Sequence, residues 1–472
     1  MTAPAEDFIA RSREALGDTS LQAALARARP GFVRKRASAV ALVANFDALK
    51  AKAKAVRQRS LRDLDSYLAV FEQRVTAAGG RVHWAATTAD LRRIVLDIAR
   101  ATGARSATKG KTMVGEEAKL NEALEEAGIQ PRETDLGEYI IQLAGEPPSH
   151  IVAPALHKTR AQIVELFLRD HHLGERELAS VKDLVDEART VIRRHYLEAD
   201  IGITGANILI ADTGTCVLCT NEGNGDLTAS LPNTHIVTTS IDKVVASWDD
   251  ASALLRVLAR SATGQAITTY TSFYGPRGDG DLDGPEHFHV VLLDNRRSQL
   301  LGSDFQEMLQ CIKCGACMNH CPVYQAVGGH SYNSVYPGPM GAVLTPLLRG
   351  EPGDFALADA STFCGRCEEV CPVGIPLPAL LRKLREMSAR QRGQGPGPWL
   401  IKGFTWLARH PRLYRWSTSL TTALLARISG RRGSWRRFPG LGRWLRYRDL
   451  AAPQGSSFQH QWRKARGGED RA

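Results

Sequence analysis

Seven of the nine cysteines lie between residues 311 and 371, in two runs that have the spacing of metal ligands. The first run follows the pattern C-x2-C-x2-C-x3-C-P and consists of Cys311, Cys314, Cys317 and Cys321. Bacterial-type ferredoxins use this pattern, because three thiolates on one tight turn bind three irons of a cubane and the fourth reaches a second cluster. Zinc ribbons use two C-x2-C pairs instead. The first run therefore predicts iron–sulfur chemistry.

The second run matches the last three cysteines of the same pattern, with Ser361 at the position of the first. Two-cluster ferredoxins exchange ligands between their two runs. This crossed ligation predicts that the ligands of cluster one are Cys311, Cys314, Cys317 and Cys371. It predicts that the ligands of cluster two are Cys321, Cys364 and Cys367. One iron of cluster two is then left without a thiolate.

The missing thiolate leaves three interpretations of cluster two open. It is a 4Fe-4S cluster with an oxygen or exogenous fourth ligand, a 3Fe-4S cluster, or a cluster that takes its fourth ligand from a partner protein. Ser361 is a candidate oxygen ligand, although a serine that caps a helix N-terminus fits the sequence equally well. We favour two 4Fe-4S clusters, the second with one labile corner.

Two clusters in one module favour an electron relay over a structural role. Together they hold two electrons, which matches a two-electron substrate oxidation. The gap between Cys321 and Cys364 is longer than in compact bacterial ferredoxins and predicts a helical insertion. We therefore expect residues 301–391 to form a helical two-cluster ferredoxin domain.

The whole chain of 472 residues corresponds to about three domains, and its apolar and charged fractions of 43% and 24% are those of a globular protein. Helical spacing of Ala and Leu, seen through residues 39–56 and 61–78, predicts a helical region over residues 1–78. Residues 79–300 alternate between strand and helix patterns, which predicts an α/β domain with a largely parallel sheet. The expected strands are 80–84, 129–134, 207–211, 216–220, 236–239, 267–273 and 289–293. The expected helices are 89–102, 116–127, 183–197 and 251–261.

The C-terminal part, residues 392–472, is a Gly/Pro linker followed by a basic, Trp/Arg-rich helical region. From Leu381 to Ala472 the chain carries 21 Lys/Arg and 4 Asp/Glu, and six of its eight tryptophans lie beyond residue 398. Aromatic residues among cations suit a partner protein, a membrane surface or a nucleic acid. We favour packing and partner docking, with peripheral membrane contact as the second interpretation and nucleic acid as the third.

The remaining cysteines, Cys216 and Cys219, also have C-x2-C spacing but lie in an apolar strand. Strand residues three apart point to opposite faces, so the two thiols cannot easily bind one ion. We expect both to be buried as small apolar residues.

The start of the chain lacks a basic, apolar export signal, and no apolar run approaches the about 18 residues of a membrane span. These features predict a cytoplasmic protein, with contact to the inner face of the membrane as an alternative.

The α/β part contains segments that resemble the LUD domain of bacterial lactate-utilisation proteins. They are Lys109–Met113, Glu133–Glu138, Pro148–Ile151, Gly202–Asn207, Ala211–Thr215 and Thr220–Asn224. Joined to the two cysteine runs and the Arg/Trp-rich tail, the chain resembles the lactate utilization protein B family over nearly its whole length. The serine at position 361 also fits that family.

The resemblance implies an iron–sulfur electron-transfer subunit in the oxidation of L-lactate to pyruvate. The partners it implies are a cysteine-rich redox subunit and a second LUD-domain protein. It also implies a LUD fold similar to sugar-phosphate isomerases and CoA transferases, whose glycine-rich turns hold small anions. By that analogy a pocket for a small hydroxy or keto acid would be lined by Lys109, Lys111, Thr204, Asn207, Glu222 and Asn224.

Two other functions remain as alternatives to the electron-transfer subunit. In the first, the open iron of cluster two binds the hydroxy acid as a Lewis acid, and the chain is a catalytic subunit. In the second, the basic tail makes the chain an iron–sulfur protein that binds nucleic acid. Flavin and nicotinamide motifs are not recognisable in the sequence, which favours a chain that receives electrons over one that abstracts hydride.

Overall fold

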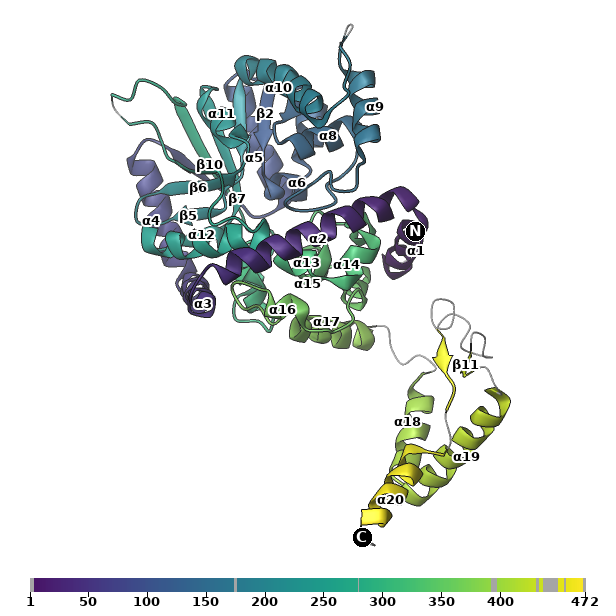
Figure 1. Ribbon diagram of the computed structural model, residues 1–472. Helices are drawn as coiled ribbons and strands as arrows, with labels where there is room; N and C mark the ends of the chain where they lie inside the picture. The colour runs from purple at the N-terminus through teal and green to yellow at the C-terminus, as the bar shows by residue number, and fades with distance from the viewer. Residues whose placement is uncertain are drawn as a thin grey trace. The chain divides into compact units, whose positions relative to one another are not determined.

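The computed structural model describes residues 4–173, 176–278, 280–391, 397–429, 433–435, 449–453 and 456–469. The chain divides into two compact units, Met1–Ser388 and Ala389–Ala472. The first unit contains the α/β part and both cysteine runs (Figure 1).

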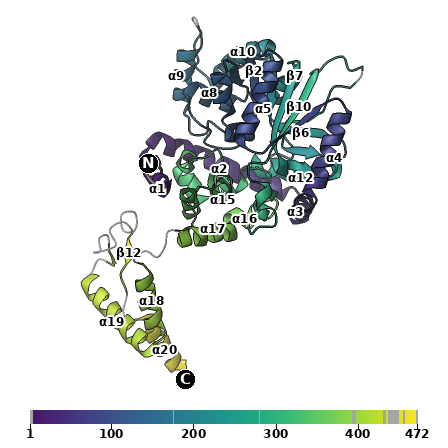
Figure 2. The same ribbon diagram turned by 180° about the vertical axis from the view of Figure 1, so that it is seen from behind.

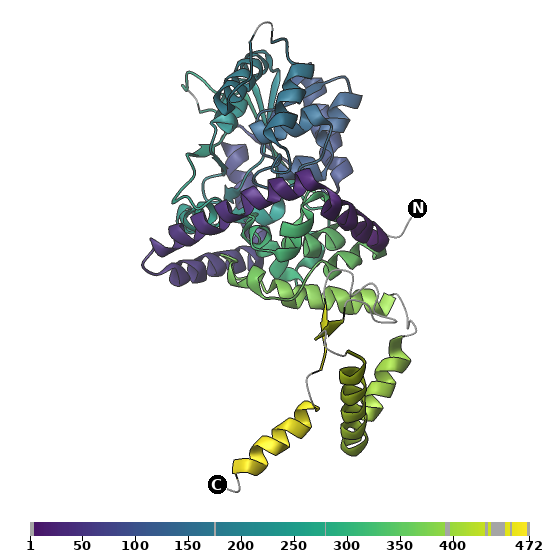
Figure 3. The same cartoon turned by 45° about the vertical axis from the view of Figure 1, so that its right-hand side comes forward.

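Four helices occupy the N-terminal segment: α1 (Pro4–Gly17), α2 (Thr19–Ala41), α3 (Phe46–Arg62) and α4 (Leu64–Ala77). The helical spacing over 61–78 corresponds to α4, whereas the spacing over 39–56 is interrupted between the end of α2 and the start of α3. The helix breaks because the side chain of Asn45 accepts a hydrogen bond from the Ala48 amide and so caps the start of α3. Figures 1 and 3 show α2 running along the boundary between the α/β part and the helices that carry the cysteines.

A six-stranded sheet in the order β1-β10-β7-β4-β2-β3 forms the centre of the α/β part, and all its pairs are parallel. Its strands are β1 (Arg81–Ala85), β2 (Ser106–Gly110), β3 (Gln130–Glu133), β4 (Ile201–Thr204), β7 (Thr234–Ser240) and β10 (His287–Leu293). The expected parallel sheet is confirmed. The central strands β2 and β4 were not among the expected strands.

A second sheet in the order β8-β5-β6-β9, with parallel and antiparallel pairs, was not expected. Its strands are β5 (Ile208–Ile210), β6 (Thr215–Thr220), β8 (Val244–Val245) and β9 (Tyr270–Tyr274).

The helices of the α/β part are α5 (Thr88–Ala101), α6 (Met113–Glu117), α7 (Leu120–Glu126), α8 (Leu136–Ala144), α9 (Arg160–Asp170), α10 (Val181–Glu198), α11 (Asn224–Ser230) and α12 (Trp248–Ala262). Figure 2 shows them from behind.

Short helices surround the two cysteine runs. They are α13 (Ala316–Asn319), α14 (Pro322–Val327), α15 (Gly338–Arg349), α16 (Arg366–Glu369) and α17 (Leu377–Gln391), with 3-10 turns at Ile241–Lys243, Ser298–Leu300, Gln306–Gln310, His330–Tyr332 and Pro352–Asp359. The helical insertion expected between Cys321 and Cys364 is therefore present. One apolar core continues from α3 and α12 into this region, so the cysteine runs fold against the α/β part.

The second unit contains α18 (Gly397–Ala408), α19 (Pro411–Ser429), the short antiparallel pair β11 (Ser434–Trp435) and β12 (Leu450–Ala451), and α20 (Phe458–Glu469). Trp399, Trp406, Trp416 and Trp462 are each at least half exposed, so this unit does not bury them in a core of its own. The Trp/Arg-rich residues 436–448 of the predicted tail lie outside the described residues. Among the described helices, none is both long enough and apolar enough for a membrane crossing.

Candidate metal centre and adjoining cavity

Three thiols of the first run, joined by Cys371 from the second, line one hollow. Its lining residues include Cys311, Cys314, Cys317 and Cys371, and its walls are mostly apolar, with Ile151, Met340 and Val373 among them. The turn that brings the three thiols of the first run together needs left-handed backbone at Lys313 (φ 58°) and Gly315 (φ 75°).

Backbone amides point at sulfurs of this hollow. The Lys313 amide donates to Cys311 Sγ and the Ile375 amide to Cys371 Sγ, both at 3.4 Å. Burial raises the pKa of the Cys317 thiol well above its usual value, and the neighbouring thiolates of Cys311, Cys314 and Cys371 raise it further. Thiols this close together are costly to ionise unless a positive charge lies between them. They therefore fit the donor set of a bound cation or cluster.

The other three motif cysteines form a second group. Burial raises the pKa of Cys367 to about 12, and the nearby thiolates of Cys321 and Cys364 contribute. Burial also raises the pKa of Cys321, again with Cys364 as a neighbour. Cys364 is exposed, whereas Cys321 and Cys367 are buried, so this group reaches the surface of the protein.

Cys317 connects the two groups, because Cys367 is also among the thiols that raise its pKa. The donor set therefore has two adjacent parts, one with four thiols and one with three. This composition fits two iron–sulfur clusters. When bound, such clusters supply one-electron redox centres.

Ser361 is placed near the second run but caps no helix. Its Oγ accepts a hydrogen bond from the Phe363 amide at 3.2 Å, and α16 begins five residues beyond, after Gly365. The expectation of a helix N-cap at Ser361 is therefore wrong, because its hydroxyl closes a local turn.

Cations from the N-terminal helices hold the second run. The donors are Arg36 of α2 and Lys50 and Lys54 of α3, which bind the carbonyl groups of Val370 (3.0 Å), Glu369 (3.2 Å) and Gly374 (3.3 Å). These side chains orient the backbone on both sides of Cys371 and place positive charge beside the thiolates.

A buried charge network holds the backbone just before Cys311. The guanidinium of Arg57 (1% exposed) donates to the carbonyl groups of Leu309 at 2.8 Å and Gln310 at 3.2 Å. Lys243 donates to Cys311 O and to Asp242, both at 2.9 Å. Sequence reasoning missed these positioning residues because Arg57 lies among many similar cations of α3.

His150, which lies in one of the LUD-like segments, positions the first run from the other side. Its Nδ1 accepts the amides of Val152 and Ala153 at 3.0 Å, so Nε2 carries the proton and donates to Asn319 Oδ1 at 2.7 Å. Burial lowers the pKa of His150 to about 4, so the imidazole stays neutral and this hydrogen-bond pattern persists.

A cavity of about 310 Å3 lies between the α/β part and the first cysteine run. Lys111, Glu138, Asn207 and Glu222 line it from the α/β part, and Lys313 and Cys314 line it from the cysteine run. This volume suits a small molecule. The cavity therefore brings polar side chains of the LUD-like segments to a wall that contains a predicted cluster ligand.

The charges of this cavity are arranged around Lys111. Its ammonium pairs with Asp135, and its backbone amide donates to Glu138 Oε2 at 3.2 Å. Burial raises the pKa of Glu138 well above its usual value, and the nearby carboxylates of Glu133 and Asp135 raise it further. Burial also raises the pKa of Glu222. The α/β part thus offers the cavity one cation, Lys111, and two carboxyl groups that can hold a proton, and Lys313 lines the cavity from the cysteine run.

Three of the six predicted pocket residues, Lys111, Asn207 and Glu222, line this cavity, whereas Lys109, Thr204 and Asn224 lie in the core. Lys109 Nζ is 2.6 Å from both Glu116 Oε1 and Glu133 Oε1. Thr204 Oγ1 is 2.8 Å from His235 Nε2. The Asn224 side chain is buried at the start of α11. Glu138 and Lys313 were missed, although Glu138 belongs to one of the LUD-like segments.

The two cysteines outside the motifs differ from each other. Cys216 is buried (1% exposed) and packs in the core beside β5, as expected. Cys219 is only partly buried and lines the cavity, and burial raises its pKa to about 11. The two residues pack against different cores, which confirms that they point to opposite faces of β6.

Comparison with protein families matches three consecutive parts of the chain. Residues 68–293 match the LUD domain, residues 307–375 match the 4Fe-4S dicluster domain, and residues 380–467 match the C-terminal region of lactate utilisation protein B.

Relatives that match over nearly the whole chain are named lactate utilization protein B or B 2. Lactate utilization protein B of Bacillus pumilus is 41% identical over 98% of both chains. That of Bacillus velezensis is 42% identical over 97% of both chains. Lactate utilization protein B 2 of Bacillus mycoides is 39% identical over 98% of both chains.

Proposed function

Since the chain belongs to the lactate utilization protein B family, we propose that it is an iron–sulfur electron-transfer protein in the oxidation of L-lactate to pyruvate. The observation that carries this proposal is the division of seven motif thiols into two adjacent groups. Oxidation of L-lactate to pyruvate releases two electrons and two protons. Two one-electron centres side by side can hold both electrons until a partner takes them.

The proposed ligands follow the two groups. Cluster one takes Cys311, Cys314, Cys317 and Cys371, and cluster two takes Cys321, Cys364 and Cys367. The exposed position of Cys364 supports access of an exogenous fourth ligand to cluster two and electron exchange with a partner there. A cysteine-rich redox subunit and a second LUD-domain protein of the same system are the proposed partners.

Metal content and redox titration test the proposal. Protein prepared without oxygen is expected to contain about eight iron and eight sulfide ions per chain. Titration with dithionite, followed by EPR, is expected to show two centres that together take up two electrons. Cys216→Ser, which changes a buried cysteine outside both groups, should leave both signals in place. Colourless protein, or protein that holds zinc in place of iron, would contradict the proposal.

The cavity supplies the proposed site for the small hydroxy or keto acid. The Lys111 ammonium would pair with the carboxylate of the acid, and Glu138 or Glu222 would hold the proton that the hydroxyl group loses. Since Cys314 lines the same cavity, an acid bound there lies next to cluster one and not next to cluster two.

We expect Lys111→Met to weaken binding of L-lactate and pyruvate at least tenfold, because Lys111 is the only cation that the described residues of the α/β part contribute to the cavity wall. Anaerobic isothermal titration calorimetry measures the loss. Lys52→Met, at an exposed position of α3, is the matched control and should bind as the unaltered protein does. In EPR, lactate should perturb the cluster-one signal. A perturbed cluster-two signal with cluster one unchanged would instead support catalysis at the open iron.

A further inference from the structure

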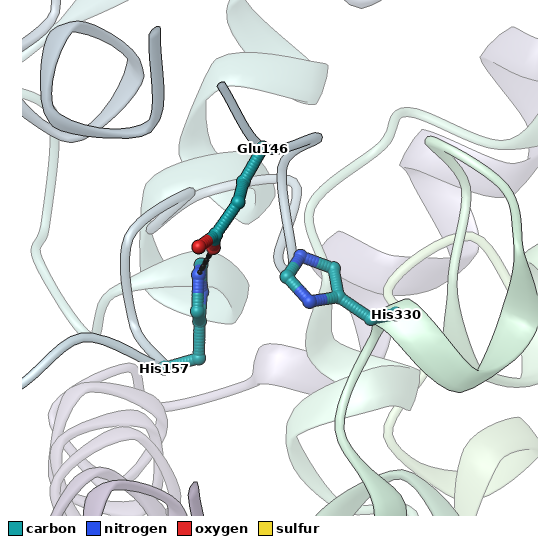
Figure 4. Close-up of side chains that lie close together, drawn as sticks. All are labelled: Glu146, His157 and His330. Atoms are coloured by element: carbon teal, nitrogen blue, oxygen red, sulfur yellow. Dashed lines mark hydrogen bonds and ion pairs between the residues drawn. The ribbon is translucent and has the colours of Figure 1, made fainter. Parts of the chain in front are cut away.

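Three potential metal ligands converge away from both cysteine groups. Glu146 and His157 belong to the loops that follow α8, and His330 belongs to the 3-10 turn after α14. One ligand atom from each of the three lies within 4.8 Å of those of the other two. Figure 4 shows the Glu146 carboxylate and the two imidazole rings turned toward one another.

The backbone of the two segments is held together without any ion. The Tyr324 hydroxyl donates to Ser149 O at 2.8 Å. Gly329 approaches the same residue so closely that a Cβ there would lie 1.8 Å from Ser149 O. The donor atoms are therefore placed before binding, which lowers the entropic cost of capturing an ion.

The hydrogen bonds of His330 leave one nitrogen free to act as a ligand. Its Nε2 lies 2.8 Å from Pro147 O, and because a carbonyl only accepts, Nε2 carries the proton. The lone pair is then on Nδ1. A backbone carbonyl that orients the imidazole in this way is the usual outer partner of a metal-binding histidine.

His157 has the complementary arrangement. Its Nδ1 is 2.7 Å from Ser149 Oγ, whose hydroxyl donates to Pro154 O at 3.0 Å. With Nδ1 protonated, Nε2 presents a lone pair to Glu146 Oε2 at 2.7 Å. In the other tautomer the Ser149 hydroxyl donates to Nδ1 and a proton on Nε2 lies between the ring and Glu146 Oε2, and a metal ion can take the place of that proton.

The third donor favours a metal ion. A proton between His157 and Glu146 uses only two of the three donors, although the His330 ring lies 4.5 Å from that of His157, centroid to centroid. A metal ion uses all three donors. The ammonium of Lys158 pairs with Glu146 Oε1 and leaves Oε2 for the ion, although its charge reduces the attraction of the site for a cation.

We propose that Glu146, His157 and His330 bind one divalent transition-metal ion of the zinc class. Two imidazoles and a carboxylate are a known zinc donor set with one open position. A cavity of about 220 Å3 borders both imidazoles, so water or a small anion can fill that position. The ion ties a loop of the LUD domain to the segment that follows Cys321.

Zinc is the probe that separates this site from the clusters. Holoprotein with both clusters is titrated with Zn2+ against a chromophoric chelator, and bound zinc is examined by X-ray absorption at the zinc edge. We expect one zinc per chain, unchanged iron, sulfide and EPR signals, and only nitrogen or oxygen neighbours at about 2.0–2.1 Å. A sulfur shell near about 2.3 Å would show zinc in the cysteine groups and would overturn the proposal.

Variants test the three ligands separately. His330→Ala and His157→Ala should each weaken zinc binding at least tenfold while both cluster signals remain, which also shows that the variants fold. His287→Ala, at an exposed position of β10, is the matched control and should bind zinc normally. Lys158→Gln removes the opposing charge and should tighten zinc binding several-fold. Failure to bind zinc, or unchanged affinity in His330→Ala, overturns the proposal.

Discussion

Anaerobically prepared Cys371→Ser protein is expected to lose cluster one and to keep most of cluster two. Cys371 lies in the second run, but the thiols that share its surroundings are those of the first: it raises the pKa of both Cys314 and Cys317. A serine hydroxyl is a much weaker ligand for iron than a thiolate. Iron and sulfide per chain should therefore fall to about half, and one of two EPR signals should disappear.

Cys367→Ser provides the mirror experiment. Its neighbours are Cys321 and Cys364, so it should remove the cluster-two signal and retain cluster one. Cys216→Ser controls for loss of a buried thiol as such, since Cys216 packs only in the core. If Cys371→Ser instead removed cluster two alone, the assignment of ligands to the two clusters would be reversed.

Arg297→Met is expected to lower the free energy of unfolding by about 3–5 kcal/mol, since it leaves a buried carboxylate without its partner. Arg297 is 1% exposed and binds both oxygens of Glu117, with Nη1–Oε1 at 3.0 Å and Nη2–Oε2 at 2.6 Å. The Tyr336 hydroxyl donates to the same carboxylate at 2.6 Å. The thermal unfolding midpoint of the holoprotein, followed by circular dichroism, should fall by several degrees. Arg296→Met, at the adjacent exposed arginine, should change it little.

The pH dependence of this loss gives a second measurement. Burial alone would raise the pKa of Glu117, but the charge and hydrogen bonds of Arg297 bring it below its usual value. In the unaltered protein the stabilisation is complete above the unfolded-state pKa, about 4.3, and is lost as pH falls through the folded-state pKa. In the Arg297→Met variant, burial dominates and raises the pKa of Glu117. The Glu117 carboxylate of the folded variant therefore takes up a proton as the pH falls. The difference in unfolding midpoint between the two proteins should therefore be smaller at pH 6 than at pH 8; an equal difference would contradict this account.

Periodicity located most of the elements but not the most central ones. The expected helix over 89–102 and strand over 289–293 appear as α5 and β10 with small changes at their ends. The central strands β2 and β4 were missed because they are short and contain Lys109, Gly110, Gly202 and Thr204 within their bounds. Lysine and glycine are poor strand formers, and these positions are buried here through parallel pairing with neighbours distant in sequence.

The sequence by itself determined the chemistry of the cysteines, because the spacing within one turn decides which thiolates can meet around a cluster. It also indicated part of the cavity, through Lys111, Asn207 and Glu222. Only the tertiary structure decided that Cys314 and Lys313 face the same cavity, that Arg57 and His150 position the first run, and that His330 meets Glu146 and His157. These contacts join residues up to hundreds of positions apart, and their geometry depends on how the core packs, which local spacing does not encode.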